Sequence, residues 1–140
     1  MRFLLDTNII ANPASVAPDA RIVKELAAHG PSCAIPAIVW HELVWGCARL
    51  PHGRRRTRFE DYLRDVVKPI YPILPYDEVA AAWHASERAR LDQRGHPPPF
   101  ADGQIAAIAA VNGLVLVTQN RKDFARFTAL HVVNWSSRTR

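Results

Sequence analysis

Short runs of Ile, Val and Leu alternate along the chain with longer segments whose apolar residues recur at helical spacing. The apolar runs predict strands at Phe3–Ile10, Ala34–Val39, Ile70–Leu74, Leu114–Thr118 and His131–Trp135. The helical patterns cover Asp19–His29, Ala37–Leu50, Arg54–Val66 and Asp77–Arg94, with a further apolar helix in GQIAAIAAVNG. This alternation predicts an α/β fold, with a mainly parallel sheet covered by helices on both faces.

Proline and glycine mark the boundaries between these elements. Gly95 ends the last long helix before a stiff connector, His96-Pro97-Pro98-Pro99. With 140 residues and 49% apolar content, residues 1–140 are expected to form a single domain with a substantial core.

A carboxylate interrupts the first apolar run. In RFLLDTNII, Asp6 follows a strongly apolar strand and precedes Thr7 and Asn8. Burying an acid there is costly unless a cation or a dense set of hydrogen bonds pairs with it. A turn-forming or capping Asp is the alternative, because DTN is good turn chemistry. Ligands of open parallel sheets bind at the carboxyl ends of strands, so Asp6 and the loop TQNRKDF after the fourth strand are expected on one rim.

Glu42 is the second acid in an unusual setting. Helical spacing in WHELVWGCARL places Glu42 with Trp45 and Arg49, on the side opposite Trp40, Leu43, Val44 and Cys47. A solvated glutamate beside an arginine is one interpretation. An aromatic residue on that polar side instead indicates a cleft wall or a partner surface.

Two further acids stand at the starts of predicted helices. Asp102 directly precedes GQIAAIAAVNG, and Asp123 precedes Phe124 in the loop after the fourth strand. Each could be an N-cap, a role that is compatible with ligand binding. Asn120, three residues before Asp123, is a competing polar ligand from the same loop.

All four acids can converge on one rim of the sheet. Clustered carboxylates repel one another, and a hard divalent cation keeps them ionised. We therefore expect Mg²⁺, with Mn²⁺ able to substitute, held by Asp6, Glu42, Asp102 and Asp123. One or two such ions would activate a water molecule toward a phosphodiester and stabilise the leaving oxygen.

The charge balance favours a polyanionic partner. The chain carries 18 Lys and Arg against 13 Asp and Glu, a formal charge of +5. Arg54-Arg55-Arg56 with Arg58 could follow a phosphate backbone, or could be a solvated helix start answered by Glu60 and Asp61.

Other chemistries lack their motifs. The chain has no GxSxG, Walker loop, GxGxxG or HExxH, and its six His residues have no metal-ligand spacing. Cys33 and Cys47 are not in CxxC spacing and are expected to be buried thiols of a reducing cytoplasm. We find neither a signal-peptide pattern nor a run of the roughly 20 apolar residues that a membrane span needs, so a soluble cytoplasmic protein is expected.

The segments RFLLDTNII, IPAIVWHELVWG, FADGQIAAIAA and LVLVTQNRKDF, in this order, resemble a PIN domain, and more narrowly the VapC-type toxins of bacterial toxin–antitoxin pairs. The resemblance covers essentially the whole chain. It implies a small three-layer α/β/α sandwich with four to five strands and a Mg²⁺-dependent endoribonuclease.

The resemblance also assigns residues and partners. Asp6, Glu42 and Asp102 match the metal-binding acids of the family, and Asp123 matches a more variable fourth acid that members place at either the Asn120 or the Asp123 position. Thr7, Asn8 and Thr118 match polar residues that support the acids. The family implies a homodimer and a cognate VapB-like antitoxin that covers the site. From the residues themselves, Trp45 is a candidate wall of the antitoxin groove, and Arg49, Arg54, Arg55 and Arg58 are candidates for RNA contact.

Two other hypotheses remain open at this stage. A basic RNA-binding module with a non-catalytic metal site would bind RNA in a salt-sensitive way without turnover. A phosphotransferase would use Asp6 as a nucleophile, but this chemistry usually needs a second Asp two residues on, where the chain has Asn8.

Overall fold

A five-stranded parallel sheet forms the centre of the protein. The computed structural model describes residues 1–137. The strands are β1 (Phe3–Leu5), β2 (Cys33–Pro36), β3 (Ile73–Leu74), β4 (Val115–Val117) and β5 (Val132–Val133), in the order β3-β2-β1-β4-β5. All four neighbouring pairs are parallel, and Phe3 lies opposite both Cys33 and Val115. The prediction of an α/β fold with a mainly parallel sheet is confirmed.

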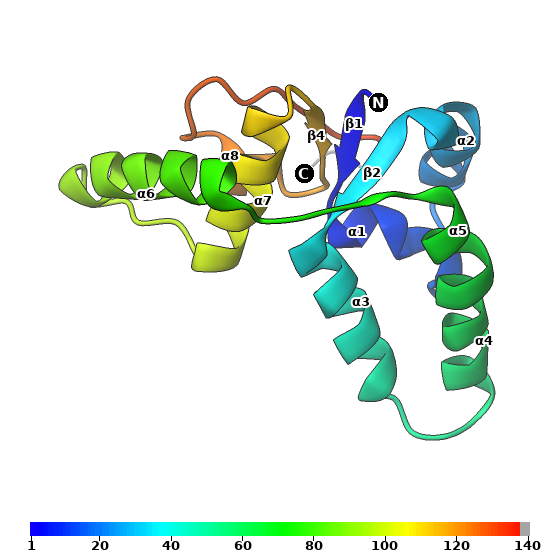
Figure 1. Ribbon diagram of the computed structural model, residues 1–140. Helices are drawn as coiled ribbons and strands as arrows, with labels where there is room; N and C mark the ends of the chain where they lie inside the picture. Colours follow the sequence, from blue (N-terminus) through cyan, green and yellow to red (C-terminus); the bar gives the residue numbers. More distant parts are fainter. Residues whose placement is uncertain (138–140) are drawn as a thin grey trace.

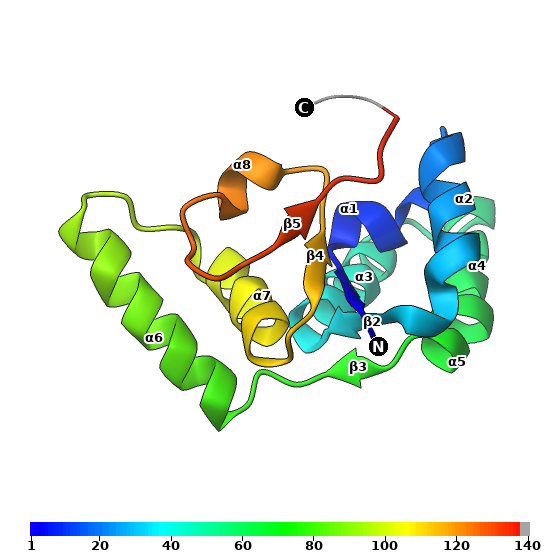
Figure 2. The same cartoon turned by 90° about the horizontal axis from the view of Figure 1, so that it is seen from above.

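Helices connect the strands and cover the sheet. They are α1 (Thr7–Ile10), α2 (Ala20–His29), α3 (Ala37–Ala48), α4 (Arg54–Tyr62), a π-helical stretch at Leu63–Val67, α5 (Lys68–Ile70), α6 (Glu78–Gln93), α7 (Phe100–Val111) and α8 (Arg121–Phe124). Seen from above, α6 and α7 lie on one side of the strands and α2, α4 and α5 on the other (Figure 2). These layers form the expected α/β/α sandwich. Within residues 1–137, none of the helices is long and apolar enough to cross a membrane.

The chain adds strands first on one side of β1 and then on the other side, at β4. The chain passes from β1 through β2 to β3, and then returns through α6 and α7 to β4 on the other side of β1 (Figure 1). Because crossovers between parallel strands are right-handed, this reversal puts the two sets of helices on opposite faces. Asp6 and Thr118, which directly follow β1 and β4, therefore lie at the switch point where open α/β sheets bind ligands.

The predicted strands at Phe3–Ile10 and Ile70–Leu74 are both too long. β1 ends at Leu5, because Asp6 caps a short helix in which Ile9 and Ile10 are fully buried. Burial of each isoleucine contributes roughly 1.5–3 kcal/mol whether it comes from a strand or a helix, so the apolar run alone does not separate the two. Ile70 ends α5, and only Ile73 and Leu74 pair with β2.

The exposure of the α3 side chains agrees with the predicted buried and exposed sides, except at Val44. Leu43 and Cys47 are buried, and Trp45 is 54% exposed as expected, but Val44 is 42% exposed rather than buried. Cys33 and Cys47 are both free and buried, in agreement with the sequence.

Candidate functional site

Asp6 sits in a dense set of hydrogen bonds at the end of β1. It is the N-cap of α1, and its Oδ1 accepts a 2.8 Å bond from the backbone N–H of Thr7. Its Oδ2 accepts a 2.7 Å bond from the hydroxyl of Thr118. The side chain is only 8% exposed. Asp6 is therefore both the N-cap of α1 and a fixed, buried carboxylate.

Hydrogen bonds attach the loop after β4 to the same rim of the sheet. The hydroxyl of Thr118 also accepts a 3.0 Å bond from the backbone N–H of Asn120. Oδ1 of Asn8 accepts a 3.0 Å bond from the backbone N–H of Gln119. The predicted supporting residues Asn8 and Thr118 thus tie the ends of β1 and β4 together, as their shared rim requires.

Glu42 reaches this rim from α3. It projects from α3, and its Oε2 accepts a 2.5 Å hydrogen bond from the hydroxyl of Thr7. Thr7 therefore links two of the predicted acids, since its backbone donates to Asp6 and its side chain to Glu42. The alternative interpretation, a freely solvated Glu42, is therefore wrong.

Asp102 lies inside the first turn of α7 rather than before it. The N-cap of α7 is Pro99, which provides no side-chain cap, so the N-cap interpretation of Asp102 was wrong. An acid in a first turn still interacts favourably with the helix dipole. The sequence placed the start of this helix late because FAD carries no strong helix signal after three prolines.

His84 holds the turn that carries Asp102. A Cβ at Gly103 would lie 2.0 Å from Nε2 of His84, so only glycine fits there. The His84 ring is 2% exposed, packs 4.7 Å from the ring of Phe100, and is linked through Nδ1 to the hydroxyl of Tyr76 at 2.8 Å. Burial and the nearby Arg88 lower the pKa of His84. Sequence reasoning missed His84, although a glycine inside a helical pattern is the signal of such a close approach.

Asp123 and Asn120 lie on α8 and at its start. Asp123 is the third residue of α8 and is exposed, so it is not the N-cap that sequence reasoning considered. Asn120 occupies the cap position, but its side chain provides no cap hydrogen bond. Only Asp123 of these two carries a charge that acts on the other acids.

The pKa values of Asp102 and Asp6 respond to the other acids. Burial, and then the charges of Asp123, Asp6 and Glu42, raise the pKa of Asp102 to about 6. Burial raises the pKa of Asp6 as well, with further increases from Glu42 and Asp123, against the lowering effect of its hydrogen bonds to Thr118 and Thr7. Four segments far apart in sequence have therefore brought negative charge to one place that is partly shielded from water.

This donor set suits a hard divalent cation. Carboxylate oxygens are the ligands that Mg²⁺ and Mn²⁺ prefer, and a cation would reverse the mutual repulsion of the acids. Within residues 1–137, no three His, Cys, Asp or Glu side chains are already close enough to hold a metal ion. Binding would thus require rotation of the outer side chains, which the exposed Asp123 is free to make, around the fixed Asp6.

A groove runs beside Thr7 and Glu42, between α3 and α4. Its volume is about 670 Å³, and the lining includes Trp45, Arg49, Arg55 and Phe59. The guanidinium carbon of Arg49 lies 3.7 Å from the centre of the Trp45 ring. Of the predicted RNA contacts, Arg49 and Arg55 therefore border the acidic site, while Arg54 and Arg58 are exposed on α4 outside this lining.

The interpretation of the arginine run as a solvated helix start is only partly right. Arg56 pairs with Glu60, with 3.7 Å between Nε and Oε1, and donates to the carbonyl of Leu50. Asp61 instead pairs with Arg64.

Known proteins of similar sequence cover nearly the whole chain. A family model for the PIN domain matches residues 3–130. Toxin FitB of Neisseria gonorrhoeae is 33% identical over 124 residues, which are 86% of this chain and 89% of that protein. VapC ribonuclease Y4jK of Sinorhizobium fredii is 31% identical over 134 residues, or 94% of this chain and 95% of that protein.

Solved structures share the fold over the same span. A crystal structure of FitAcB from Neisseria gonorrhoeae superposes with a TM-score of 0.86 at 32% identity, covering 94% of this chain and 96% of that one. DNA-bound VapBC from Salmonella typhimurium superposes with a TM-score of 0.81 at 27% identity, covering 96% and 98%. With its parallel sheet, its converging acids and these relatives, the chain belongs to the PIN-domain family, among the VapC-type toxins.

Proposed function

We propose that this protein is a Mg²⁺-dependent endoribonuclease toxin that hydrolyses phosphodiester bonds of RNA, with Mn²⁺ able to replace Mg²⁺. The observation that carries the proposal is the convergence of the acids: Thr7 donates to both Asp6 and Glu42, and burial and the charges of Asp123, Asp6 and Glu42 raise the pKa of Asp102. Relatives that cover nearly the whole chain are named as ribonucleases, and one from Shigella flexneri as a tRNA(fMet)-specific endonuclease.

The four carboxylates would hold the cation, and their neighbours keep the innermost one in place. When bound, the cation supplies an activated water and charge neutralisation at the phosphate. Each oxygen of Asp6 already accepts one hydrogen bond, from Thr7 or from Thr118, so its orientation is fixed before any cation arrives. Thr7 orients Glu42 toward the same point. Asp102 and Asp123 approach from α7 and α8, with Asn120 a rival to Asp123.

Substrate binding would rest on the basic surface around this acidic centre. The chain has a formal charge of +5, and RNA affinity depends on cations that neutralise phosphates. Arg49 and Arg55 border the site from the groove between α3 and α4, and Arg54 and Arg58 extend the same helix surface. The natural RNA would be met in the cytoplasm.

The protein would act with a VapB-like antitoxin and as a homodimer. Similar structures include VapBC2 of Rickettsia felis bound to a fragment of its promoter DNA and a toxin–antitoxin complex from Klebsiella pneumoniae. In this chain the groove beside Glu42 offers exposed Trp45 and half-buried Phe59 to a partner segment, next to the acids that such a segment would cover.

Cleavage of cellular RNA by the purified protein tests this function. We expect cleavage in Mg²⁺ or Mn²⁺, none in EDTA, and loss of cleavage in Asp6→Asn with the fold retained by circular dichroism. Full activity of Asp6→Asn in EDTA contradicts the proposal. Salt-sensitive RNA binding without turnover in Mg²⁺ or Mn²⁺ would identify a basic RNA-binding module instead.

A further inference from the structure

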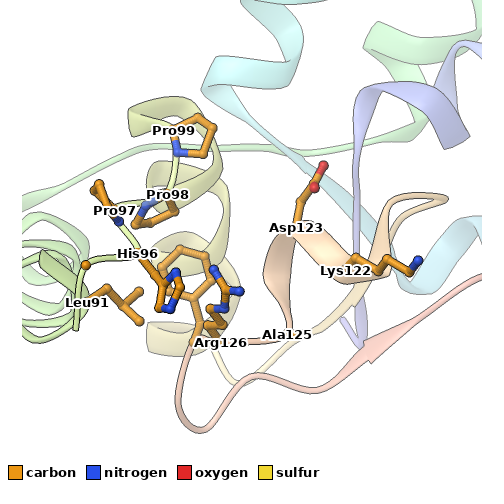
Figure 3. Close-up of a pocket in the computed structure, with 11 residues that line it drawn as sticks. Leu91, His96, Pro97, Pro98, Pro99, Lys122, Asp123, Ala125 and Arg126 are labelled. Atoms are coloured by element: carbon orange, nitrogen blue, oxygen red, sulfur yellow. The ribbon is translucent and has the colours of Figure 1, made fainter.

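A second cleft lies beside Asp123, on the side away from the groove of Trp45 and Glu42. It has a volume of about 620 Å³, within the range of roughly 300–1,000 Å³ that is usual for ligand sites. Figure 3 shows Pro97, Pro98 and Pro99 on one side of it and Lys122 and Asp123, from α8, on the other. Asp123 lines this cleft, and its charge raises the pKa of Asp102 and Asp6, so the cleft adjoins the acidic centre at Asp123.

The two walls of the cleft are held by one helix. At the end of α6, the backbone N–H of His96 donates a 3.0 Å bond to the carbonyl of Leu91, and Gly95 takes a positive φ of 73° that starts the proline wall. From the same helix, Nη2 of Arg90 donates a 2.7 Å bond to the carbonyl of Arg126 in the other wall. Three consecutive prolines limit the motion of the first wall further. The cleft is therefore preorganised.

The second wall is braced through Glu87. Arg90 pairs with Glu87 at 2.9 Å, and Oε1 of Glu87 accepts from the backbone N–H of Thr128 at 2.7 Å. The bonds to Arg126 and Thr128 hold the chain on both sides of Phe127, a buried residue of the cleft lining. This network uses the backbone of Arg126 and leaves its guanidinium for other partners.

The charges at the cleft suit a phosphate chain. Arg126 and His96 are exposed there, whereas the side chain of Lys122 points away from the prolines (Figure 3). Among residues 1–137, Arg126 forms no ion pair, in contrast to Arg56, Arg64 and Arg90. An unpaired cation in a concave site attracts phosphate groups, and the proline faces provide an apolar surface for a base. An acidic protein segment would meet the same cation, but the position of Asp123 in the lining favours a strand that continues to the catalytic centre.

We propose that this proline-walled cleft binds the single-stranded RNA that flanks the cleaved bond, with Arg126 contacting its phosphates. The proposal rests on the ribonuclease function above and adds a substrate path on the α8 side of the acids. It makes Arg126 a binding residue without a role in the chemical step.

Salt-dependent RNA binding provides the first test. Arg126→Ala is made in an Asp6→Asn background, and binding of a fluorescently labelled single-stranded RNA of mixed sequence is followed by anisotropy between about 50 and 200 mM salt. The variant should reduce the magnitude of the negative slope of log K against log salt by roughly 0.7, the value for one lost contact to a single strand. Lys24→Ala removes the same charge from the exposed surface of α2, which lies away from α8 in both ribbon views (Figures 1 and 2), and should leave the slope unchanged.

Kinetics with intact Asp6 provide the second test. Arg126→Ala should raise KM for RNA about tenfold, as expected for one lost charged contact, with kcat unchanged. An unchanged slope and an unchanged KM in Arg126→Ala, or an equal change in Lys24→Ala, overturns the proposal. Unchanged RNA binding with weakened binding of the antitoxin would assign the cleft to the protein partner instead. A wild-type protein that binds RNA through the cleft but cleaves none in Mg²⁺ would contradict the ribonuclease function and not the cleft.

Discussion

The hydroxyl of Thr118 donates a 2.7 Å hydrogen bond to Oδ2 of Asp6, although the two residues are 112 positions apart. Thr118 is fully buried, and the same hydroxyl accepts from the backbone of Asn120. One oxygen atom thus joins the ends of β1 and β4 at the switch point of the sheet. The orientation of Asp6, and with it the metal site we propose, depends on this bond.

Thr118→Val should keep the volume of the side chain and remove both bonds. We expect a loss of about 10–100-fold in Mg²⁺ affinity or cleavage rate, as for other partners that orient metal ligands. The free energy of unfolding should fall by about 1–3 kcal/mol, because Asn120 N–H and Asp6 lose a buried partner. Calorimetric Mn²⁺ titration and urea unfolding measure the two effects. Thr57→Val, whose hydroxyl bonds to Gly53 on the exposed start of α4, is the matched control and should change neither.

Gly103→Ala should disturb Asp102 through His84. The added Cβ would lie 2.0 Å from Nε2 of His84, and overpacking of this kind costs typically about 1–3 kcal/mol. We expect lower stability together with weaker cleavage, because the turn that carries Asp102 must move. Combining it with His84→Ala should recover part of the stability lost by Gly103→Ala, as measured by a double-mutant cycle. Additive losses in the double variant would rule out this contact as the cause.

Asp102→Asn should stabilise the metal-free protein at high pH. The folded-state pKa of Asp102, about 6, lies above its ordinary value of 3.8. Protonated Asp102 is therefore favoured by folding, an advantage that is complete below about pH 4 and disappears as the pH rises through 6. In EDTA at pH 8, we expect the variant to be more stable than wild type by about 1–2 kcal/mol, a value reduced for partial exposure.

The difference should vanish near pH 4, and Mg²⁺ at pH 8 should stabilise wild type more than the variant. Asp65→Asn is a suitable control, because Arg64 lowers the pKa of Asp65, so its loss should bring no gain at pH 8. A wild-type protein as stable in EDTA as Asp102→Asn at pH 8 would mean that the acids do not repel one another.

Glu87→Gln should remove stability that depends on pH in the opposite sense. Arg90 and Thr128 hold the pKa of Glu87 at about 2, below its ordinary value of 4.5. This contribution is present above about pH 4.5 and is lost as the pH falls toward 2. We expect the variant to lose about 2 kcal/mol at pH 7 and much less at pH 3, measured by thermal unfolding across this range. Glu78→Gln, on the exposed first turn of α6, should produce no such pH-dependent loss.

The sequence predicts the order of the elements well because hydrophobic periodicity is a local property. Asp77, the first residue of the predicted helix Asp77–Arg94, is the N-cap of α6, so the predicted start is correct within one residue. The same reasoning wrongly predicts a strand through to Ile10, since Ile9 and Ile10 are as buried in α1 as they would be in a strand. Val44 is exposed because α3 meets its neighbours along a narrower stripe than the apolar spacing suggests.

The acids of the site can be found from sequence, but their supporting contacts cannot. An acid at the end of an apolar strand, such as Asp6, is unusual enough to stand out. The bonds of Glu87 to Thr128, and the contact of His84 with Gly103, join residues that only the tertiary fold brings together. The connector His96 to Pro99 reads as a stiff linker, and its role as a cleft wall depends on where α8 lies.

Binding of Mn²⁺ followed by electron paramagnetic resonance tests most directly whether the converged carboxylates form a metal site. Wild type should take up Mn²⁺ with a signal distinct from the free ion, and Mg²⁺ should compete for it. Asp6→Asn and Asp102→Asn should each weaken binding strongly while the circular dichroism spectrum stays that of wild type. Unchanged Mn²⁺ affinity in both folded variants would contradict the account.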